Sequence, residues 1–194
     1  MSLAPWRSPL AHALHRSRRY PEARYFQLAT VDAEGFPHNR TVVFRGFTHE
    51  SNGIKIITDR RSAKIPHLHY QPRAAICWYF SKTREQWRFQ GTIQLITDAE
   101  TDTARSQDRQ QIWQSLSDNA RVQFAWPSPA SLRPDVEQAI DVDFPDPITP
   151  LPTFYVLYFH PHQVDHLELR GNPQNLTRYC LAADQCWDIQ HLFP

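Results

Sequence analysis

Arginine, lysine and hydroxyl side chains at two places in the sequence have the chemistry needed to hold a phosphate group. The segment RTVVFRGF carries Arg40 and Arg45 on what reads as a β-strand, and Ser62 and Lys64 follow near an expected helix start. A guanidinium can bind a phosphate through two hydrogen bonds, and a hydroxyl, an ammonium and a helix dipole add to this attraction. These residues could therefore form a phosphate site, but the spacing alone favours a simpler interpretation, in which both arginines are charges that protect an edge strand from aggregation.

Glycine-rich phosphate-binding loops are missing from the sequence. The chain has only five glycines, and it contains neither G-x-G-x-x-G nor a P-loop pattern. A backbone nest for a phosphate depends on glycine at closely spaced positions. Any phosphate that this protein binds is therefore expected to be held by side chains.

The elements that must position these residues read as strands joined by hairpins. Two β-rich runs flank the turn-forming residues 32–35, and residues 84–96 show a period-2 pattern with Trp87, Phe89, Ile93 and Leu95 on one side. Further strands are expected at residues 53–59, 73–80, 153–160, 162–169 and 177–182, and helices at residues 5–19, 62–72 and within 98–123. Hairpins with inserted helices predict a mainly β fold, an antiparallel barrel with peripheral helices.

Length and composition narrow the classes of protein. A chain of 194 residues suits one domain, with an N-terminal helix over 1–20 and a helical, proline-rich insertion over 98–150. Its formal charge of +1 gives no reason to expect nucleic acid or an anionic membrane as a partner. Three widely spaced cysteines predict no disulfide framework, and no apolar run is long enough to span a bilayer. We therefore expect a cytoplasmic protein.

Three segments together resemble a known family. FQLATVDAEGFPHNRTVVFRGF, IKIITDRRSAK and REQWRFQGTIQLI are similar, in order and spacing, to the pyridoxamine 5′-phosphate oxidase family of FMN-binding split barrels. The similarity covers about residues 25–96 and resumes at HQVDHLELRGNPQNLTRYCL. It implies a single FMN-binding split-barrel domain over 1–194, FMN as cofactor, and a homodimer with flavin at the subunit interface. The implied activity is that of an FMN-dependent oxidoreductase.

The resemblance also assigns cofactor-binding roles to individual residues. Arg40 is expected at the FMN phosphate or ribityl chain, and Trp126 is expected to reach the flavin of the partner subunit. Ala63 stands where the family usually has arginine, and Arg60 or Arg61 could replace that charge. The full set implied is Arg40, Thr41, Val42, Val43, Ile57, Thr58, Ser62, Ala63, Lys64, Gln86, Trp126 and Arg178.

The substrate side departs from the family pattern. Arg45 matches a basic position that faces the substrate, but Glu168 falls where the family has a tryptophan near the flavin. The Arg-x-His pair that holds pyridoxamine 5′-phosphate in the oxidase falls on Gln174 and Leu176. An amide and an aliphatic chain cannot replace a guanidinium and an imidazole. We therefore predict a different substrate, and no catalytic residue is identified.

Several alternatives stay open. The chain could be a flavin carrier or sensor without turnover, or a genuine pyridoxamine 5′-phosphate oxidase, and a split barrel could hold deazaflavin or haem instead of FMN. His67 and His69 are read as residues of a helix surface or loop, and no metal site is predicted. Acidic residues near 141–146 are read as a solvated turn rather than a calcium site. Unlike Trp126, three other tryptophans are expected to be core or interface anchors: Trp78, Trp87 and Trp113.

Overall fold

The structure is a computed structural model that describes residues 3–48, 52–133, 140 and 142–194. The chain forms two compact units. The first unit comprises Met1–Ile56, Pro66–Gln94 and Tyr158–Pro194, and the second comprises Ile57–Ile65 and Leu95–Leu157. Each unit is described by itself below.

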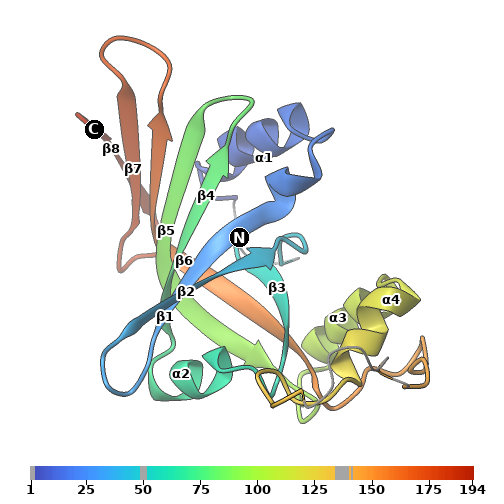
Figure 1. The fold of residues 1–194 in the computed structure, drawn as a ribbon. Coiled ribbons are helices and arrows are strands. Elements are labelled where there is room, and N and C mark those ends of the chain that lie inside the picture. Colours follow the sequence, from blue (N-terminus) through green and yellow to red (C-terminus); the bar gives the residue numbers. More distant parts are fainter. Residues whose placement is uncertain (1–2, 49–51, 134–139, 141) are drawn as a thin grey trace. The chain divides into compact units, whose positions relative to one another are not determined.

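One eight-stranded sheet organises the fold (Figure 1). The strands follow the order β2-β1-β4-β5-β6-β7-β8, and β3 pairs with β6. The ladders β1–β2, β1–β4, β4–β5, β6–β7 and β7–β8 are antiparallel, which confirms the mainly β prediction. The strands are β1 (Tyr25–Val31), β2 (Pro37–Val43), β3 (Ile54–Asp59), β4 (Arg73–Phe80), β5 (Glu85–Ile96), β6 (Phe154–Glu168), β7 (Asn175–Leu181) and β8 (Trp187–Leu192).

Short helices accompany the strands. The first helix, α1 (Arg7–Arg16), buries Leu10 and Ala13 and is preceded by the fully buried Trp6. None of the described helices is both long and apolar enough to cross a bilayer. The others are η1 (Pro21–Arg24), α2 (Lys64–Tyr70), α3 (Thr103–Gln114), α4 (Asp118–Arg121) and η2 (Val122–Phe124).

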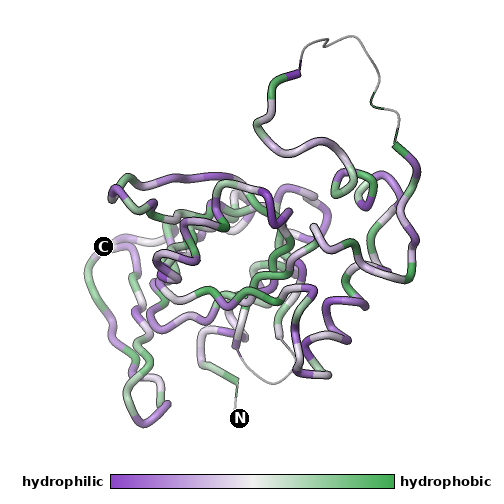
Figure 2. Tube along the Cα trace, turned by 90° about the horizontal axis from the view of Figure 1, so that it is seen from below, coloured by the Kyte–Doolittle hydropathy of each residue, from purple (hydrophilic) through white to green (hydrophobic). Residues whose placement is uncertain are grey.

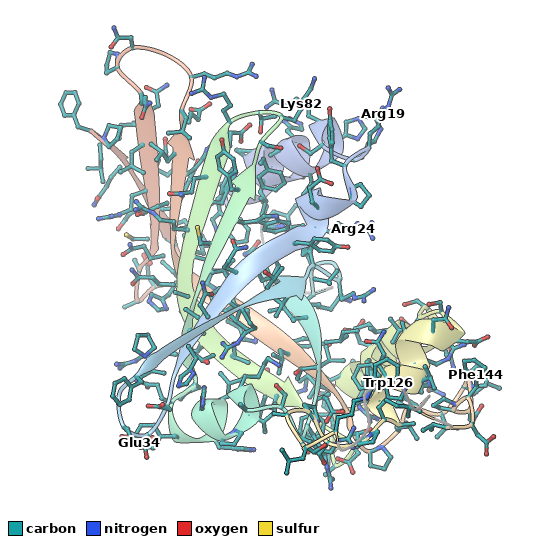
Figure 3. All side chains as sticks on the ribbon, viewed as in Figure 1. Arg19, Arg24, Glu34, Lys82, Trp126 and Phe144 are labelled. Atoms are coloured by element: carbon teal, nitrogen blue, oxygen red, sulfur yellow. The ribbon has the colours of Figure 1, made fainter. Side chains whose placement is uncertain are left out.

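The β1–β2 hairpin is fixed by Asp32. Its Oδ1 accepts hydrogen bonds from the backbone N–H of Glu34 (3.1 Å) and of Phe36 (2.8 Å), an arrangement typical of an aspartate that nucleates a turn. Gly35 has φ +89°, a conformation that favours glycine. Glu34 lies at the tip of this hairpin, and Lys82 lies at the β4–β5 turn (Figure 3).

The core of the first unit is aromatic. Figure 2 shows hydrophilic and hydrophobic residues interspersed along the chain, and β1 and β5 bury alternate residues, so each of these two strands turns one face to the core. Trp78 lies 4.9 Å from Phe26 and 5.2 Å from Phe80, measured between ring centroids, and its Nε1 donates to the Ala23 carbonyl. Trp78 and Trp87 are fully buried, as predicted.

The second unit packs around a separate aromatic cluster of Trp113, Phe124 and Phe154, whose ring centroids lie 5.0–5.9 Å apart. Arg109 on α3 donates to the carbonyls of Phe154 (2.9 Å) and Leu151 (2.8 Å), so this guanidinium ties the helix to the segment that precedes β6. Trp113 is fully buried, as predicted.

Two strand predictions are wrong. Residues 153–160 and 162–169 were expected to form two strands, but they form one 15-residue strand, β6, which continues through Pro161. The ladder from β6 to β7 starts at Gln163, so the missing N–H of Pro161 costs no bond on that side. The strand β8 was not predicted at all, although Trp187 and Ile189 alternate there with Asp188 and Gln190.

Candidate cofactor site

Three of the residues implied to bind the cofactor lie together in the second unit. The ammonium of Lys64 donates to Thr58 Oγ1 at 2.8 Å and to Ser62 Oγ. Thr58 lies near the end of β3, and Lys64 is the first residue of α2. One cation and two hydroxyls on adjacent segments form a donor set suited to phosphate oxygens. Ile57 precedes Thr58 on β3, and Ala63 is exposed.

The arginine missing at position 63 has one available substitute nearby. Arg61 is already committed, because it donates to both oxygens of Asp59 (2.9 and 2.6 Å) and to the carbonyls of Phe124 and Trp126. Hydrogen bonding to Asp59 raises the pKa of Arg61. The side chain of Arg60 is exposed and has no hydrogen-bond partner among the residues that the structure describes. Arg60 is therefore the better candidate to supply the missing charge.

Trp126 is the one predicted tryptophan that does not lie in a core. It keeps 39% of its surface exposed, and Arg61 Nη1 holds its backbone carbonyl at 2.8 Å (Figure 3 labels the ring). The segment after η2 is thereby anchored to the Asp59–Arg61 pair within the second unit. An exposed, anchored indole is available to a molecule outside this chain, which is the role that the resemblance implies.

In the first unit, Arg40 is half-buried on β2. Its Nη1 donates to the Leu28 carbonyl at 3.0 Å and to Thr30 Oγ1 at 2.8 Å, and burial lowers its pKa. These bonds occupy one nitrogen of the guanidinium and fix its orientation. The other N–H donors of the guanidinium remain for a ligand.

The remaining predicted residues of this unit divide between the two faces of the sheet. Residues paired directly across an antiparallel ladder share a face. Tyr25 pairs with Val43, Gln27 pairs with both Thr41 and Cys77, and Cys77 pairs with Arg88, so these side chains share one face. Gln86 lies on that face too, whereas Arg40 and Val42 project from the other.

A hollow of about 390 Å³ lies in the first unit and contains Arg178. Asp165 accepts hydrogen bonds there from Arg178 (2.8 and 3.0 Å) and from Arg88 (3.0 Å). Burial raises the pKa of Asp165, but the hydrogen bond and charge of Arg178, with the charge of Arg88, outweigh it and hold that pKa below its usual range. The other lining residues are polar or small: Gln27, Ala29, Asn39, Ala75, Cys77, Gln90 and Gln163, with parts of Ile76 and Phe89.

Arg45, the residue implied on the substrate side, carries an unsatisfied donor. Its Nε is buried and has no hydrogen-bond partner among the described residues, while its backbone N–H donates to the Lys55 carbonyl at 2.9 Å. Burial lowers its pKa, and the charge of Arg24 lowers it further. Such a donor costs about 1–3 kcal/mol unless it is paired.

The prediction for the two histidines is right for His69, which is exposed, and wrong for His67. Only 9% of the surface of His67 is exposed, and its ring packs 4.5 Å from that of His38, between centroids. Burial lowers the pKa of His67, and the charges of His38 and Arg40 add to this effect. The sequence showed only two histidines close together, because His38 comes from a distant hairpin.

Comparison with known proteins places this geometry in a family. The family model described as pyridoxamine 5′-phosphate oxidase, FMN-binding domain, matches residues 3–97. The pyridoxine/pyridoxamine 5′-phosphate oxidase 2 of Arabidopsis thaliana is 35% identical over 195 residues, covering 99% of this chain and 98% of its own length. The chain belongs to the pyridoxamine 5′-phosphate oxidase family.

Solved structures agree with this family assignment and with the fold. An FMN-binding protein from Nostoc punctiforme, described as pyridoxamine 5′-phosphate oxidase-related, is 49% identical, with each chain covered completely and a TM-score of 0.95. PhzG from Burkholderia lata 383 shares the fold at 18% identity, with a TM-score of 0.74 over 100% of this chain and 94% of its own. The split-barrel expectation is thereby confirmed.

Proposed function

We propose that this family member is an FMN-dependent oxidoreductase. The observation that carries the proposal is the contact of the Lys64 ammonium with the Thr58 and Ser62 hydroxyls, in a chain whose family model is that of an FMN-binding domain. A bound flavin supplies the electron transfer, so the chain's own residues must bind, orient and shield it. Thr58, Ser62, Lys64 and Arg60 are proposed to hold the phosphate, with Arg40 contributing from β2.

The flavin ring is proposed to contact the backbone of Thr41, Val42 and Val43, together with Ile57, Gln86 and Arg178, and Trp126 is proposed to reach the flavin of a second subunit. The proposed assembly is a homodimer, because a flavin on the open side of a small split barrel needs a covering partner. Light scattering should report a dimer at micromolar concentration. A monomer that still carries FMN would contradict this assembly. A cytoplasmic location is also proposed, and it rests on the three free thiols.

The proposed substrate is an anion other than pyridoxamine 5′-phosphate. Arg45, which matches the basic position that faces the substrate in the family, supports an anionic group there. Gln174 and Leu176 occupy the positions of the oxidase's substrate-holding pair, and Leu176 is buried. The alternative is genuine pyridoxamine 5′-phosphate oxidation, because the Arabidopsis relative is named as an oxidase of that compound.

An absorption spectrum of the purified protein, before and after addition of FMN, tests the proposal most directly. A flavin band that stays with the protein through gel filtration is expected, and its absence in both samples would rule out FMN binding. Native mass spectrometry of the co-purified ligand separates FMN from deazaflavin and haem. Photoreduction followed by reoxidation with a panel of acceptors separates an enzyme, which prefers one acceptor, from a carrier, which reacts alike with all.

A further inference from the structure

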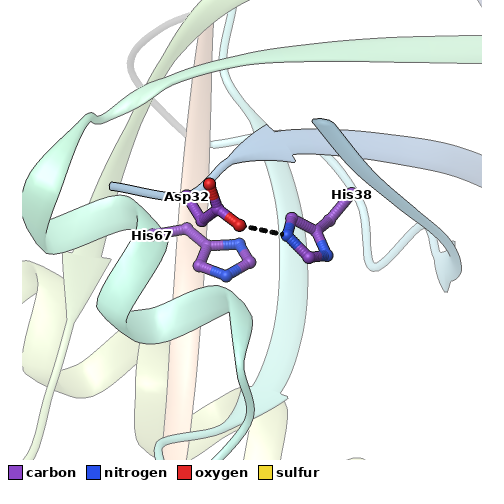
Figure 4. A group of neighbouring side chains, drawn as sticks. All are labelled: Asp32, His38 and His67. Atoms are coloured by element: carbon purple, nitrogen blue, oxygen red, sulfur yellow. Dashed lines mark hydrogen bonds and ion pairs between the residues drawn. The ribbon is translucent and has the colours of Figure 1, made fainter. Parts of the chain in front are cut away.

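Three potential metal ligands converge where the β1–β2 hairpin meets α2 (Figure 4). Asp32 and His38 come from the hairpin and His67 from the helix, and one ligand atom of each lies within 4.8 Å of the other two. Oδ2 of Asp32 is 2.7 Å from Nε2 of His38, and the two imidazole rings face each other at 4.5 Å between centroids. None of these residues has a role in the proposed flavin site.

Each side chain is held in place by a second contact. Oδ1 of Asp32 is used by the backbone of the hairpin turn, which leaves Oδ2 directed at His38. Nδ1 of His67 lies 3.0 Å from Thr30 Oγ1, and this bond fixes the orientation of its buried ring. Metal-binding side chains commonly have such supporting partners, which reduce the freedom that is lost when the ion binds.

We infer that Asp32, His38 and His67 form a binding site for a divalent transition-metal ion of the zinc type. Two imidazoles and one carboxylate are ligands that zinc accepts, at distances of about 2.0–2.2 Å. Small side-chain rotations, which the exposed His38 permits, would bring the three ligand atoms to these distances from one ion. Magnesium and calcium are disfavoured, since they prefer oxygen ligands only.

The local charges allow a cation. Asp32 supplies a carboxylate and Glu34 is a second acidic residue of the same hairpin turn, whereas Arg40 places a positive charge on the other side of Thr30. Three protein ligands leave at least one coordination position open, because His38 is exposed and the site faces solvent on the hairpin side. The site is thus of the open kind, able to take water or a small ligand at the metal.

Calorimetric titration of zinc chloride into the full-length protein, purified without a polyhistidine tag, tests this inference. One zinc ion per chain is expected. His38→Ala removes an exposed ligand, and Asp32→Asn removes the charge while its amide oxygen still accepts the turn hydrogen bonds. Each variant should weaken zinc binding by at least about 100-fold, because loss of even a supporting partner costs about 10–100-fold.

The matched control is His69→Ala, an exposed histidine on the same helix, which should bind zinc as the unchanged protein does. Circular dichroism of each variant checks that the fold is retained. Zinc binding that persists at full strength in His38→Ala and Asp32→Asn would place the ion elsewhere, for example on a cysteine, and would overturn the inference. Absence of zinc binding to the unchanged protein would do the same.

Discussion

Lys64 is the residue through which the proposed phosphate site can be tested most sharply. Lys64→Met keeps the length of the side chain and removes its charge and donors. The loss of a charge-assisted hydrogen bond typically costs about 1.5–3 kcal/mol, so FMN should bind roughly 10- to 150-fold more weakly. Titration followed by quenching of FMN fluorescence gives the affinity.

The control for that experiment is Lys82→Met, an exposed lysine at the β4–β5 turn. Its substitution should leave FMN affinity unchanged. Equal weakening by both variants would mean that net charge, and not the contact with Thr58 and Ser62, governs binding.

Asp165 provides a pH-dependent prediction. Its pKa is lower in the folded protein than in the unfolded chain, where it is about 3.9. Ionised Asp165 therefore stabilises the fold at pH values above its unfolded pKa, and this contribution is lost as the pH falls through the folded pKa. Asp165→Asn should lower the free energy of unfolding at neutral pH, and the difference should shrink in acid.

Urea unfolding at a series of pH values measures this difference. Asp143→Asn, at an exposed position in the other unit, is the control and should show little change at any pH. A difference between Asp165→Asn and the unchanged protein that stays constant down to strongly acidic pH would show that lost packing, not charge, is responsible.

The candidate site was predictable only in part at this scale. Ser62 and Lys64 are close in sequence, so they could be noticed from their spacing, whereas Thr58 was implied by the family resemblance. The Asp165–Arg178–Arg88 cluster depends on the pairing of β6 with β7, and the register of that pairing cannot be read from the sequence. The same holds for His38 and His67, whose contact needs a hairpin and a helix from separate segments.

Secondary-structure elements were predicted best where the pattern was local. The hairpin of β1 and β2 has both a turn signal and alternating strands, and the structure confirms it. The break expected at Pro161 is wrong because a proline disrupts a strand only where its N–H is needed by a neighbour. The long helix expected within 98–123 is instead α3, capped by Asp102, followed by the short α4 and η2.

The close packing of β5 against β6 at Gly91 gives a prediction about stability. A Cβ at this position would lie 2.3 Å from the carbonyl oxygen of His160 and 2.8 Å from Cζ of Phe159. The backbone oxygen cannot move away without disturbing the ladder. Gly91→Ala should therefore lower the free energy of unfolding by about 1–3 kcal/mol, as overpacked cores do.

Chemical denaturation of Gly91→Ala and of Thr92→Ala compares a crowded position with an exposed neighbour on the same strand. Thr92→Ala should change the free energy of unfolding by no more than about 0.5 kcal/mol. Equal stability of Gly91→Ala and the unchanged protein would show that the two strands can separate to admit a methyl group.

At the scale of the whole molecule, family membership and substrate must be kept apart. The family could be recognised from the sequence because ordered motifs occur along the chain. The 35% identity to the Arabidopsis oxidase, over 99% of this chain, confirms the assignment. The substrate depends on a few side chains that can change while the fold is retained. On the family resemblance, Gln174 and Leu176 are proposed to be such changes.

We predict that the FMN-loaded protein oxidises pyridoxamine 5′-phosphate negligibly. An enzyme of this kind would turn over roughly once per second or faster, and loss of the substrate-holding pair should reduce this rate by orders of magnitude. Hydrogen peroxide and pyridoxal 5′-phosphate are both measured, with an authentic oxidase as positive control. Formation of both products at ordinary enzymatic rates would restore the alternative reading.

Arg40, Thr30 and His67 form a continuous chain of hydrogen bonds, with Thr30 Oγ1 2.8 Å from Nη1 of Arg40 and 3.0 Å from Nδ1 of His67. A ligand that reorients either end must act on the hydroxyl shared by both. Thermodynamic linkage then requires reciprocity: whatever factor zinc applies to the affinity for FMN, FMN applies to the affinity for zinc. If zinc and FMN bind as proposed, Thr30 is the side chain through which one site would act on the other.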